Sequence, residues 1–286
     1  MKRKFREKVI VGCGLIFLIA LVVWIIWANA ALELNTYTIT SHELPDAFDD
    51  YRIAHVSDLH NAEMGDGNEK LLAILREAEP DIIAITGDLI DSRNTDIGIA
   101  LAFAEEAVQI APCYYVNGNH EARVSEYDEL KEGLEAAGVV VLENERVEIE
   151  LSGETITLLG VDDPSFNADY LFGDAAAVVS TKLAEITTEE DGFTVLLSHR
   201  PELFDTYVEC GMDLILSGHA HGGQFRLPVV GGLVAPNQGL FPEYDSGLYT
   251  ENGTNMIVSR GIGNSILPFR FNNRPEVIVI EMKATS

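Results

Sequence analysis

A long apolar run near the start of the chain is its most regular hydrophobic pattern. Residues 9–32 include no charged side chain, whereas residues 1–8 carry five basic side chains and one acidic side chain. Because an α-helix rises about 1.5 Å per residue, this run can cross the roughly 30 Å hydrocarbon core of a bilayer. Basic flanks tend to stay in the cytoplasm. We therefore predict a single-pass signal anchor at residues 9–32, a cytoplasmic tail at residues 1–8 and a body outside the cytoplasm.

The end of this run permits a second interpretation. Ala28-Asn29-Ala30 resembles the small-residue cleavage site of a secretory signal peptide, and cleavage there would leave a mature chain that begins near Ala31. The apolar run is longer than the about 7 to 15 residues that are usual in a cleaved signal. The pattern therefore favours an uncleaved anchor, with cleavage as the alternative.

The pattern after the apolar run predicts alternating strands and helices. Residues 33–50 are polar and extended in character, and we interpret them as a tether plus a strand that enters the body at an edge. From Tyr51 onward, apolar β-rich runs alternate with amphipathic helical patterns. We predict strands at 52–57, 81–86 and 113–116, and helices at 68–78, 97–110 and 125–137. Such a series is typical of a largely parallel sheet with helices on its faces.

The pattern changes after Val139. Two shorter strands, 146–151 and 155–160, are joined at Ser152-Gly153 as a predicted hairpin. We predict one further helix near 171–186 and further strands at 193–198, 213–217, 256–259 and 276–281. Periodicity by itself thus predicts an α/β body with a mixed sheet.

Composition indicates a globular enzyme and narrows its partners. The chain has 286 residues, of which 47% are hydrophobic, and a net charge of −27. Since the first eight residues are basic by four charges, the remainder carries −31. Such a surface repels nucleic acid, and an anionic substrate needs local positive charge, which metal ions provide. Outside the apolar run, Cys113 and Cys210 are equally compatible with a disulfide and with free thiols.

Chemically distinctive residues follow the ends of five predicted strands. These residues are Asp58 and His60, Asp88, Asn119 and His120, His199, and His219 and His221. Five of the seven histidines of the chain belong to this set. Ligands of open α/β sheets gather beyond the carboxyl ends of the strands, so we expect these side chains at one edge.

The donor types fit two-metal hydrolysis of a phosphoester. A carboxylate has two oxygens, so Asp88 can give one to each of two ions about 3.5 to 4 Å apart. Asp58 and His60 can then reach one ion, and Asn119 can offer a carbonyl oxygen to the other. The two histidines of the last block could serve different ions.

The order Asp-x-His, Gly-Asp, Gly-Asn-His-Glu, His and Gly-His-x-His resembles the calcineurin-like metallophosphoesterase superfamily over nearly all of residues 51–281. The resemblance implies a metallophosphoesterase domain at residues 51–286, built as a four-layer α/β/β/α sandwich of two mixed sheets flanked by helices. It implies one ion held by Asp58, His60, Asp88 and His221, and another held by Asp88, Asn119, His199 and His219. His120 matches the histidine that the family places beside the leaving group.

Two further motifs resemble a membrane-associated bacterial branch of this superfamily, which includes UDP-diacylglucosamine pyrophosphohydrolase-like proteins. They are Gly222-Gly223-Gln224 and Ser259-Arg260-Gly261-Ile262-Gly263. Ala220 stands where Thr is frequent in that branch, although it lies outside the ligand set. The resemblance, together with metal availability outside the cytoplasm, favours two Mn²⁺ ions, and the mixed nitrogen and oxygen donors also suit Fe or Zn.

We therefore predict a membrane-anchored extracytoplasmic phosphoesterase, with a phosphodiesterase and a monomer favoured. A hydroxide activated by the two ions would attack phosphorus in line, and His120 would protonate the departing alkoxide. One alternative is a pyrophosphohydrolase that acts on a nucleotide-linked or lipid-linked diphosphate. Another is a non-catalytic binding module of the cell envelope whose metal site is structural.

Several residues outside the ligand set have two interpretations at this point. Arg260 and Arg270 could grip a second phosphate as bidentate forks, or they could form structural ion pairs. Glu121 could orient His120, or it could be a surface carboxylate near a helix. The pattern does not decide between these roles.

For other residues a structural role is favoured. We predict that His55 is a hydrogen-bonded core or rim residue, and that Asp162 and Asp163 belong to a turn before the following proline. The apolar segments 240–242 and 266–269 are predicted to pack in a core. A groove for acyl chains beside the membrane is the alternative for these two segments.

Overall fold

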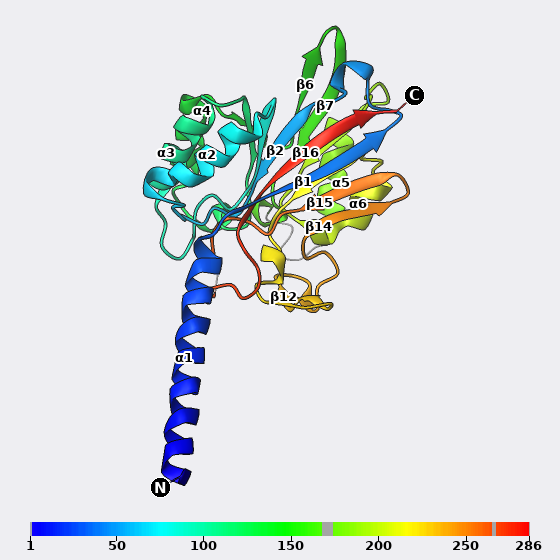
Figure 1. Ribbon diagram of the computed structural model, residues 1–286. Coiled ribbons are helices and arrows are strands. Elements are labelled where there is room, and N and C mark those ends of the chain that lie inside the picture. The colour runs from blue at the N-terminus through cyan, green and yellow to red at the C-terminus, as the bar shows by residue number, and fades with distance from the viewer. Residues whose placement is uncertain (1, 168–173, 265–266, 286) are drawn as a thin grey trace.

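A long helix, α1 (Lys2–Ala30), projects from one end of a body that contains two six-stranded sheets (Figure 1). The structure is a computed structural model that describes residues 2–167, 174–264 and 267–285. Within α1, the span Lys4–Ala30 is long and apolar enough to cross a membrane. Most apolar side chains of α1 are exposed, so it is not a core helix of the body.

The first sheet is built on the βα units that periodicity predicts. Its parallel strands are β2 (Arg52–Val56), β3 (Ile82–Thr86), β4 (Cys113–Val116) and β5 (Val140–Val141). The helices that connect them are α2 (Glu69–Ala78), α3 (Ile97–Ala107) and α4 (Tyr127–Ala137). Apolar side chains on one face of each helix pack against the sheet, as Leu71, Phe103 and Leu130 do. The predicted parallel series is confirmed.

Two long strands from the ends of the chain complete this sheet. β16 (Glu276–Ala284) pairs antiparallel with β2, and β1 (Glu33–Ser41) pairs parallel with β16 at the edge. Only Ala31 and Leu32 separate α1 from β1, so the expected edge strand begins almost directly after the helix, without a separate tether. Because β1 and β16 run side by side from Glu33, α1 lies at the end of the sheet where β16 begins.

The second sheet has the strand order β14-β15-β9-β8-β7-β6. Its strands are β6 (Glu145–Leu151), β7 (Glu154–Gly160), β8 (Thr194–Leu197), β9 (Leu214–Ser217), β14 (Gly247–Glu251) and β15 (Thr254–Val258). β6 and β7 form the predicted hairpin, in which Ser152 (φ 54°) and Gly153 (φ 88°) take the left-handed conformations of a tight turn. The central strands β7, β8, β9 and β15 are parallel.

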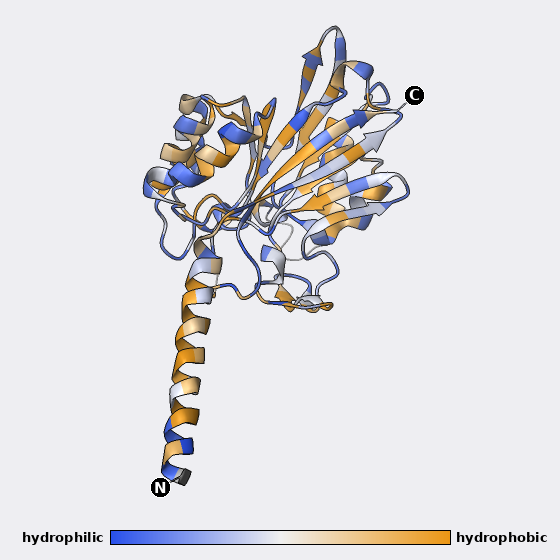
Figure 2. Ribbon diagram, viewed as in Figure 1, coloured by the Kyte–Doolittle hydropathy of each residue, from blue (hydrophilic) through white to orange (hydrophobic). Residues whose placement is uncertain are grey.

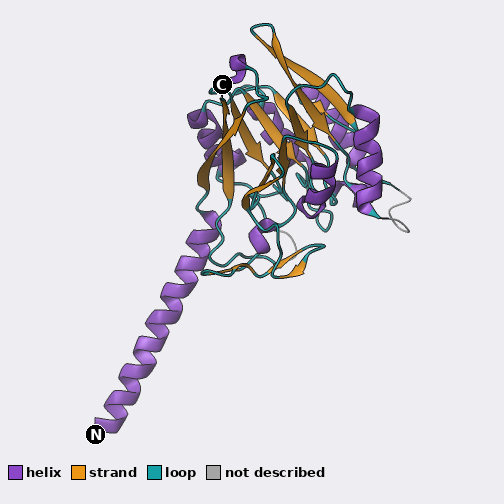
Figure 3. Ribbon diagram, turned by 90° about the vertical axis from the view of Figure 1, so that its right-hand side faces the viewer, coloured by secondary structure: helices purple, strands orange, loops and turns teal. Residues whose placement is uncertain are grey.

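Buried apolar side chains form three layers that hold the sandwich together. One layer lies between the sheets and includes Ile53, Leu158 and Leu216. A second lies between the first sheet and its helices, and a third lies between the second sheet and α5 (Ala175–Ile186) and α6 (Phe204–Glu209). Figure 3 shows helices on the outer faces of the sheets. The predicted four-layer α/β/β/α sandwich of two mixed sheets is confirmed.

Short elements account for most of what periodicity missed. Four two-residue strands lie between β9 and β14, namely β10 (Arg226–Leu227), β11 (Gly231–Gly232), β12 (Val234–Ala235) and β13 (Gly239–Leu240). Short 3-10 helices include η1 (Asp46–Phe48), η2 (Asp66–Asn68), η3 (Glu121–Arg123), η4 (Pro164–Phe166), η6 (Pro201–Leu203) and η7 (His221–Gly223). Such elements are too short to show a period. The predicted helix 171–186 is described from Ala175, and residues 171–173 lie outside the described residues.

Two structural predictions about side chains meet different outcomes. Cys113 is buried in β4 and Cys210 follows α6, and both are free thiols. The core packing predicted for residues 240–242 is wrong, because Leu240 and Phe241 are 70% and 60% exposed. Phe269 is also exposed, and Ile266 lies outside the described residues.

We expect the layer between the sheets to control stability. Leu158→Ala removes a fully buried side chain there, so it should lower the free energy of unfolding by about 2 to 5 kcal/mol. Leu151→Ala, at an exposed position of the neighbouring strand, should change it by less than about 0.5 kcal/mol. Urea titration of the full chain in detergent, followed by circular dichroism, measures both. Equal effects of the two substitutions would contradict the assignment of this layer.

Candidate metal centre

The residues that follow five strand ends converge at the end of the body nearest α1. The strands that carry them belong to both sheets: β2, β3 and β4 of the first, and β8 and β9 of the second. Potential metal-ligating atoms within 4.8 Å of one another form three buried groups: Asp58, His60 and His221; His60, Asp88 and His120; and Asp88, His199 and His219. The sequence-based expectation that these side chains meet at one edge is confirmed.

Sharp turns of the backbone direct these side chains toward a common point. Asp58, Asp88 and His219 have φ values of 53°, 52° and 65°, in the left-handed region that non-glycine residues rarely adopt. Neighbouring glycines make room for the turns. A Cβ on Gly218 would overlap Ser57 Oγ and Asp58 Oδ2. The chain therefore stores local strain where the ligating groups lie, as functional sites commonly do.

The first group brings two imidazoles against one carboxylate. His60 Nε2 lies 3.1 Å from His221 Nε2, and the two rings are stacked with centroids 4.9 Å apart. Asp58 Oδ1 is 3.7 Å from His60 Nε2 and 3.3 Å from His221 Nε2. Ser57 Oγ donates to the other oxygen of Asp58 at 2.7 Å. Two ring nitrogens and a carboxylate oxygen thus point at one small volume.

The group of Asp88, His199 and His219 has the same character, and Asp88 and His60 also belong to the group that joins it to the first. His199 Nε2 lies 3.2 Å from Asp88 Oδ2 and 3.2 Å from His219 Nδ1. His199 Nδ1 lies 2.7 Å from the main-chain oxygen of Thr86, to which it donates, so in the neutral ring Nε2 is the lone-pair nitrogen that could bind a metal. The amide of Asn119 contacts His219 Nδ1 at 2.8 Å. Metal ligands are commonly oriented by hydrogen bonds of this kind.

Asp88 lies between the two groups. Its Oδ2 is 3.5 Å from His60 Nε2 and 3.2 Å from His199 Nε2, whereas its Oδ1 accepts the main-chain N–H of His120 at 2.8 Å. The sequence predicts that each carboxylate oxygen of Asp88 faces one ion. In the structure Oδ2 faces both His60 and His199, because Oδ1 is occupied by the main-chain N–H of His120 in the loop after β4.

The electrostatics favour cations at this point. Burial opposes ionisation of Asp88, yet His199 and His60 hold its pKa well below its usual range. Burial also opposes the charge on His199, but Asp88, together with Asp58, raises the pKa of His199 to about 10. The buried carboxylates thus draw positive charge to this point. Bound divalent cations would satisfy such a donor set, which contains carboxylate, amide and imidazole groups.

Glu121 supports the site from behind, which the sequence left undecided. Its side chain is fully buried, so the surface interpretation is wrong. Its Oε2 accepts the main-chain N–H groups of Asp88 at 2.9 Å and Gly118 at 2.8 Å, and its Oε1 accepts that of Ile90 at 3.3 Å. Burial and then the charge of Asp88 raise the pKa of Glu121 to about 7. Glu121 therefore positions the Asp88 loop rather than the His120 ring.

His120 lies at the wall of a cavity of about 240 Å³ beside these groups. Ser92 donates its main-chain N–H to His120 Nδ1 at 3.0 Å, so the neutral ring carries its hydrogen on Nε2. Burial lowers the pKa of His120 to about 4, which keeps the ring neutral at pH 7. Arg93 and Arg123 also line the cavity, and sequence reasoning missed both. The only indication in the sequence that Arg93 and Arg123 lie near the site is their position close to Asp88 and His120 along the chain.

The two arginines proposed as phosphate ligands have structural partners instead. Arg260 donates to Glu33 and Glu276, each at 2.7 Å, which favours the ion-pair interpretation. Arg270 is buried and donates to the main-chain oxygens of Arg260 and Gly263. The described residues that line the cavity beside His120 do not include Arg260 or Arg270.

The favoured structural roles of three further residues are confirmed. His55 is buried, and its Nε2 lies 2.7 Å from Thr86 Oγ1. Asp163 caps η4 by accepting the N–H of Ser165 at 2.8 Å, next to Asp162 in the predicted turn. Asp163 also pairs with Arg200, whose Nη1 lies 3.2 Å from His219 Nε2. The turn thereby supports a residue of the centre.

Comparisons with known proteins identify the family to which the chain is similar. The family described as "Calcineurin-like phosphoesterase" matches residues 51–223. The chain is 30% identical over 251 residues to the uncharacterized metallophosphoesterase YkoQ of Bacillus subtilis, covering 86% of this chain and 88% of that protein. It is 27% identical to phosphodiesterase YaeI of Escherichia coli, covering 81% and 82%. It is 30% identical to a transmembrane protein with metallophosphoesterase domain of Bos taurus, covering 88% of this chain and 57% of that protein.

We expect Glu121 to govern metal affinity through the Asp88 loop. Glu121→Ala removes the acceptor of three main-chain N–H groups, so the affinity for Mn²⁺ should fall about 10- to 100-fold. Glu121→Gln keeps one acceptor oxygen and should lose less. Isothermal titration with Mn²⁺ measures both variants. Glu126→Ala, at an exposed position after η3, serves as the control and should bind as the unaltered chain does.

Proposed function

Because this chain belongs to the calcineurin-like phosphoesterase family, whose members depend on a dinuclear metal centre, we propose that the converging donors hold two divalent ions. The proposed ligands of one ion are Asp58, His60, Asp88 and His221. The proposed ligands of the other are Asp88, Asn119, His199 and His219. The family and the relatives named metallophosphoesterase and phosphodiesterase identify the chain as a hydrolase of phosphoester bonds.

One observation carries the proposal of two ions. The Nε2 atoms of His60 and His221 face each other at 3.1 Å, and Asp88 Oδ2 lies between His60 and His199. Each group alone would suit one cation, and a shared carboxylate is what a pair of close cations requires. The alternative of a purely structural site is disfavoured because a cavity lies beside the centre and is lined by His120.

The residues around the centre have distinct proposed roles in hydrolysis. When bound, the ions would activate water and neutralise charge on the phosphoryl oxygens. An anionic phosphoryl group beside His120 would favour the protonated ring, which would then give a proton from Nε2 to the departing oxygen and return to the neutral form. Arg93 and Arg123 line the cavity and would attract an anionic substrate into a chain that is acidic overall. Arg260 and Arg270 are not assigned a role with substrate.

Mn²⁺ is the proposed metal, with Fe or Zn as alternatives. The donors of the centre are imidazole nitrogen and carboxylate or amide oxygen, which suit all three metals. Mn²⁺ is favoured by the resemblance in the order of the motifs. We propose that the chain acts as a monomer, because one chain supplies a full set of proposed ligands and needs no residue from a second copy.

We propose further that α1 is an uncleaved anchor and that the body lies outside the cytoplasm. The basic residues before the span support this orientation. Contacts at its other end support retention of α1. Asn29 exchanges two hydrogen bonds with the main chain of Arg270, at 2.7 and 3.0 Å, and Arg274 lies over the ring of Trp27. Cleavage at Ala28-Asn29-Ala30 would remove both of these contacts.

A diphosphate is the second candidate substrate, as expected for a branch that resembles UDP-diacylglucosamine pyrophosphohydrolase-like proteins. The observation that favours it is that two guanidinium groups line the cavity, from Arg123 and from Arg93, which also pairs with Asp91. A second phosphate beyond the metals could accept hydrogen bonds from such groups. Hydrolysis of a soluble nucleotide-linked diphosphate, compared with a simple diester, distinguishes the two substrates.

Asp88→Asn tests the whole proposal. The substitution removes the charge shared by the two proposed ions, so kcat/KM for bis-p-nitrophenyl phosphate with Mn²⁺ should fall about 1,000-fold, the size of effect that loss of a key electrostatic group produces. Removal of metal by EDTA should abolish turnover, and Mn²⁺ should restore it. Asp96→Asn, at the exposed cap of α3, is the matched control and should retain activity. Activity of Asp88→Asn near that of the control would exclude the proposal.

His120→Asn tests the proton donor. Because a poor leaving group needs the proton more, kcat for an alkyl phosphodiester should fall about 10²- to 10⁴-fold, and kcat for a p-nitrophenyl ester should fall much less. Metal content should be unchanged. An equal loss on both substrates would assign His120 a role other than protonation.

A further inference from the structure

A group of exposed apolar side chains lies beside the metal centre. Hairpins β10–β11 and β12–β13, here called the apolar loops (residues 226–241), include Val229, Val230, Leu240 and Phe241, which are 107%, 57%, 70% and 60% exposed. The apolar loops lie at the end of the body from which α1 projects (Figures 1 and 2). Contiguous apolar surface of this kind marks an interaction site more often than chance exposure.

Contacts join the apolar loops to α1 itself. Trp24 packs edge-on against Phe271, with ring centroids 5.2 Å apart. Phe271 in turn pairs through an isolated β-bridge with Phe225, the residue before the apolar loops. Phe225 also contacts Phe269, at 5.4 Å. Trp24 lies six residues before the end of α1, so this contact is about 9 Å below Ala30 along the helix axis. The loops therefore accompany the last turns of the apolar span.

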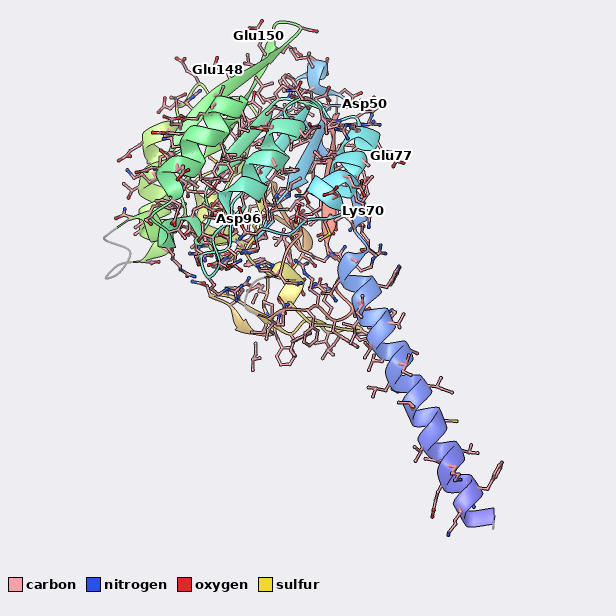
Figure 4. All side chains as sticks on the ribbon, turned by 90° about the vertical axis from the view of Figure 1, so that its left-hand side faces the viewer. Asp50, Lys70, Glu77, Asp96, Glu148 and Glu150 are labelled. Carbon is pink, nitrogen blue, oxygen red and sulfur yellow. The ribbon has the colours of Figure 1, made fainter. Side chains whose placement is uncertain are left out.

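The charge of the surrounding chain is also unusual. Residues 222–242 and 252–275 contain no Asp or Glu, in a chain that has 46 acidic residues. In contrast, the labelled carboxylates of Asp50, Glu148 and Glu150 lie at the end of the body away from α1 (Figure 4). The apolar loops thus carry no acidic side chain of their own that anionic headgroups would repel, and the nearest carboxylates in the sequence, Glu243 and Asp245, follow them.

We propose that the apolar loops dock on the same bilayer that α1 spans, and that the catalytic cavity takes a phosphoester carried by a lipid of that bilayer. Pro236 and Asn237, in the turn between β12 and β13, line the cavity, so one hairpin forms both the docking surface and a wall of the site. Asn237 Oδ1 also lies 3.2 Å from His219 Nε2. The substrate part of the proposal rests on the proposed hydrolase function and on α1 as an anchor.

The docking is tested by a probe of membrane depth that needs no turnover. Val229→Cys is labelled with an environment-sensitive fluorophore in a full-length chain in which Cys13 and Cys210 are replaced by Ala, and is placed in nanodiscs that hold one chain each. Lipids brominated near the headgroup should quench this label strongly. Leu151→Cys, on the exposed hairpin β6–β7, is the control and should not be quenched. Equal quenching at the two positions would overturn the docking. Because each disc holds one chain, a second copy of the protein cannot cover the apolar loops.

The substrate class is tested with Val229→Asp/Val230→Asp, because neither residue lines the cavity. Hydrolysis of a phosphoester on a diacylglycerol lipid in vesicles should fall about tenfold, which corresponds to roughly 1.4 kcal/mol of lost interaction. Turnover of soluble bis-p-nitrophenyl phosphate should stay unchanged. If the double substitution lowered neither the lipid activity nor the soluble activity, the proposal of a lipid substrate would be overturned. Absence of soluble turnover in the unaltered chain would instead refute the proposed function, while the depth measurement would still decide the docking.

Discussion

The architecture depends on one buried contact, in which Asp88 Oδ2 faces His60 on one side and His199 on the other. The two histidines come from different sheets, so this carboxylate can meet both only if the sheets pack face to face with their strand ends aligned. A buried carboxylate is costly unless it is paired, and here its partners are potential metal ligands and main-chain N–H groups. The apolar layer between the sheets supplies the stability that such a polar end lacks.

Support for this contact comes from groups that do not touch the cavity. Glu121 holds the Asp88 loop through its main chain, and the pair of Asp163 and Arg200 lies behind His219. Gly261 lies so close to Asp58 that a Cβ there would come within 2.6 Å of the Cβ of Asp58. The centre is thus held by rigid strand ends and by buried ion pairs, which limits its freedom to rearrange before substrate binds.

At the same end of the body, a network of opposite charges joins the start of β1, which follows α1 by two residues, to the start of β16. Glu33, at the start of β1, accepts from Arg260 and Arg274, and Glu276, at the start of β16, accepts from Arg260. Arg260 therefore links the first residues of β1 and β16 to the loop that carries Gly261. The last turn of α1 contacts the same region through Asn29, which bonds to the main chain of Arg270, and through Trp27, over which Arg274 lies.

The sequence by itself determined the αβ series, the hairpin at Ser152-Gly153 and the set of donors at strand ends, because period, turn chemistry and residue type are local properties. The tertiary structure decided which oxygen of Asp88 is shared and that Glu121 is buried. It also decided that Arg93 and Arg123, rather than Arg260 and Arg270, line the cavity. Those facts depend on the distance between residues far apart in the chain. A charged side chain has the same letter whether it faces substrate, solvent or another charge, and only packing distinguishes the three.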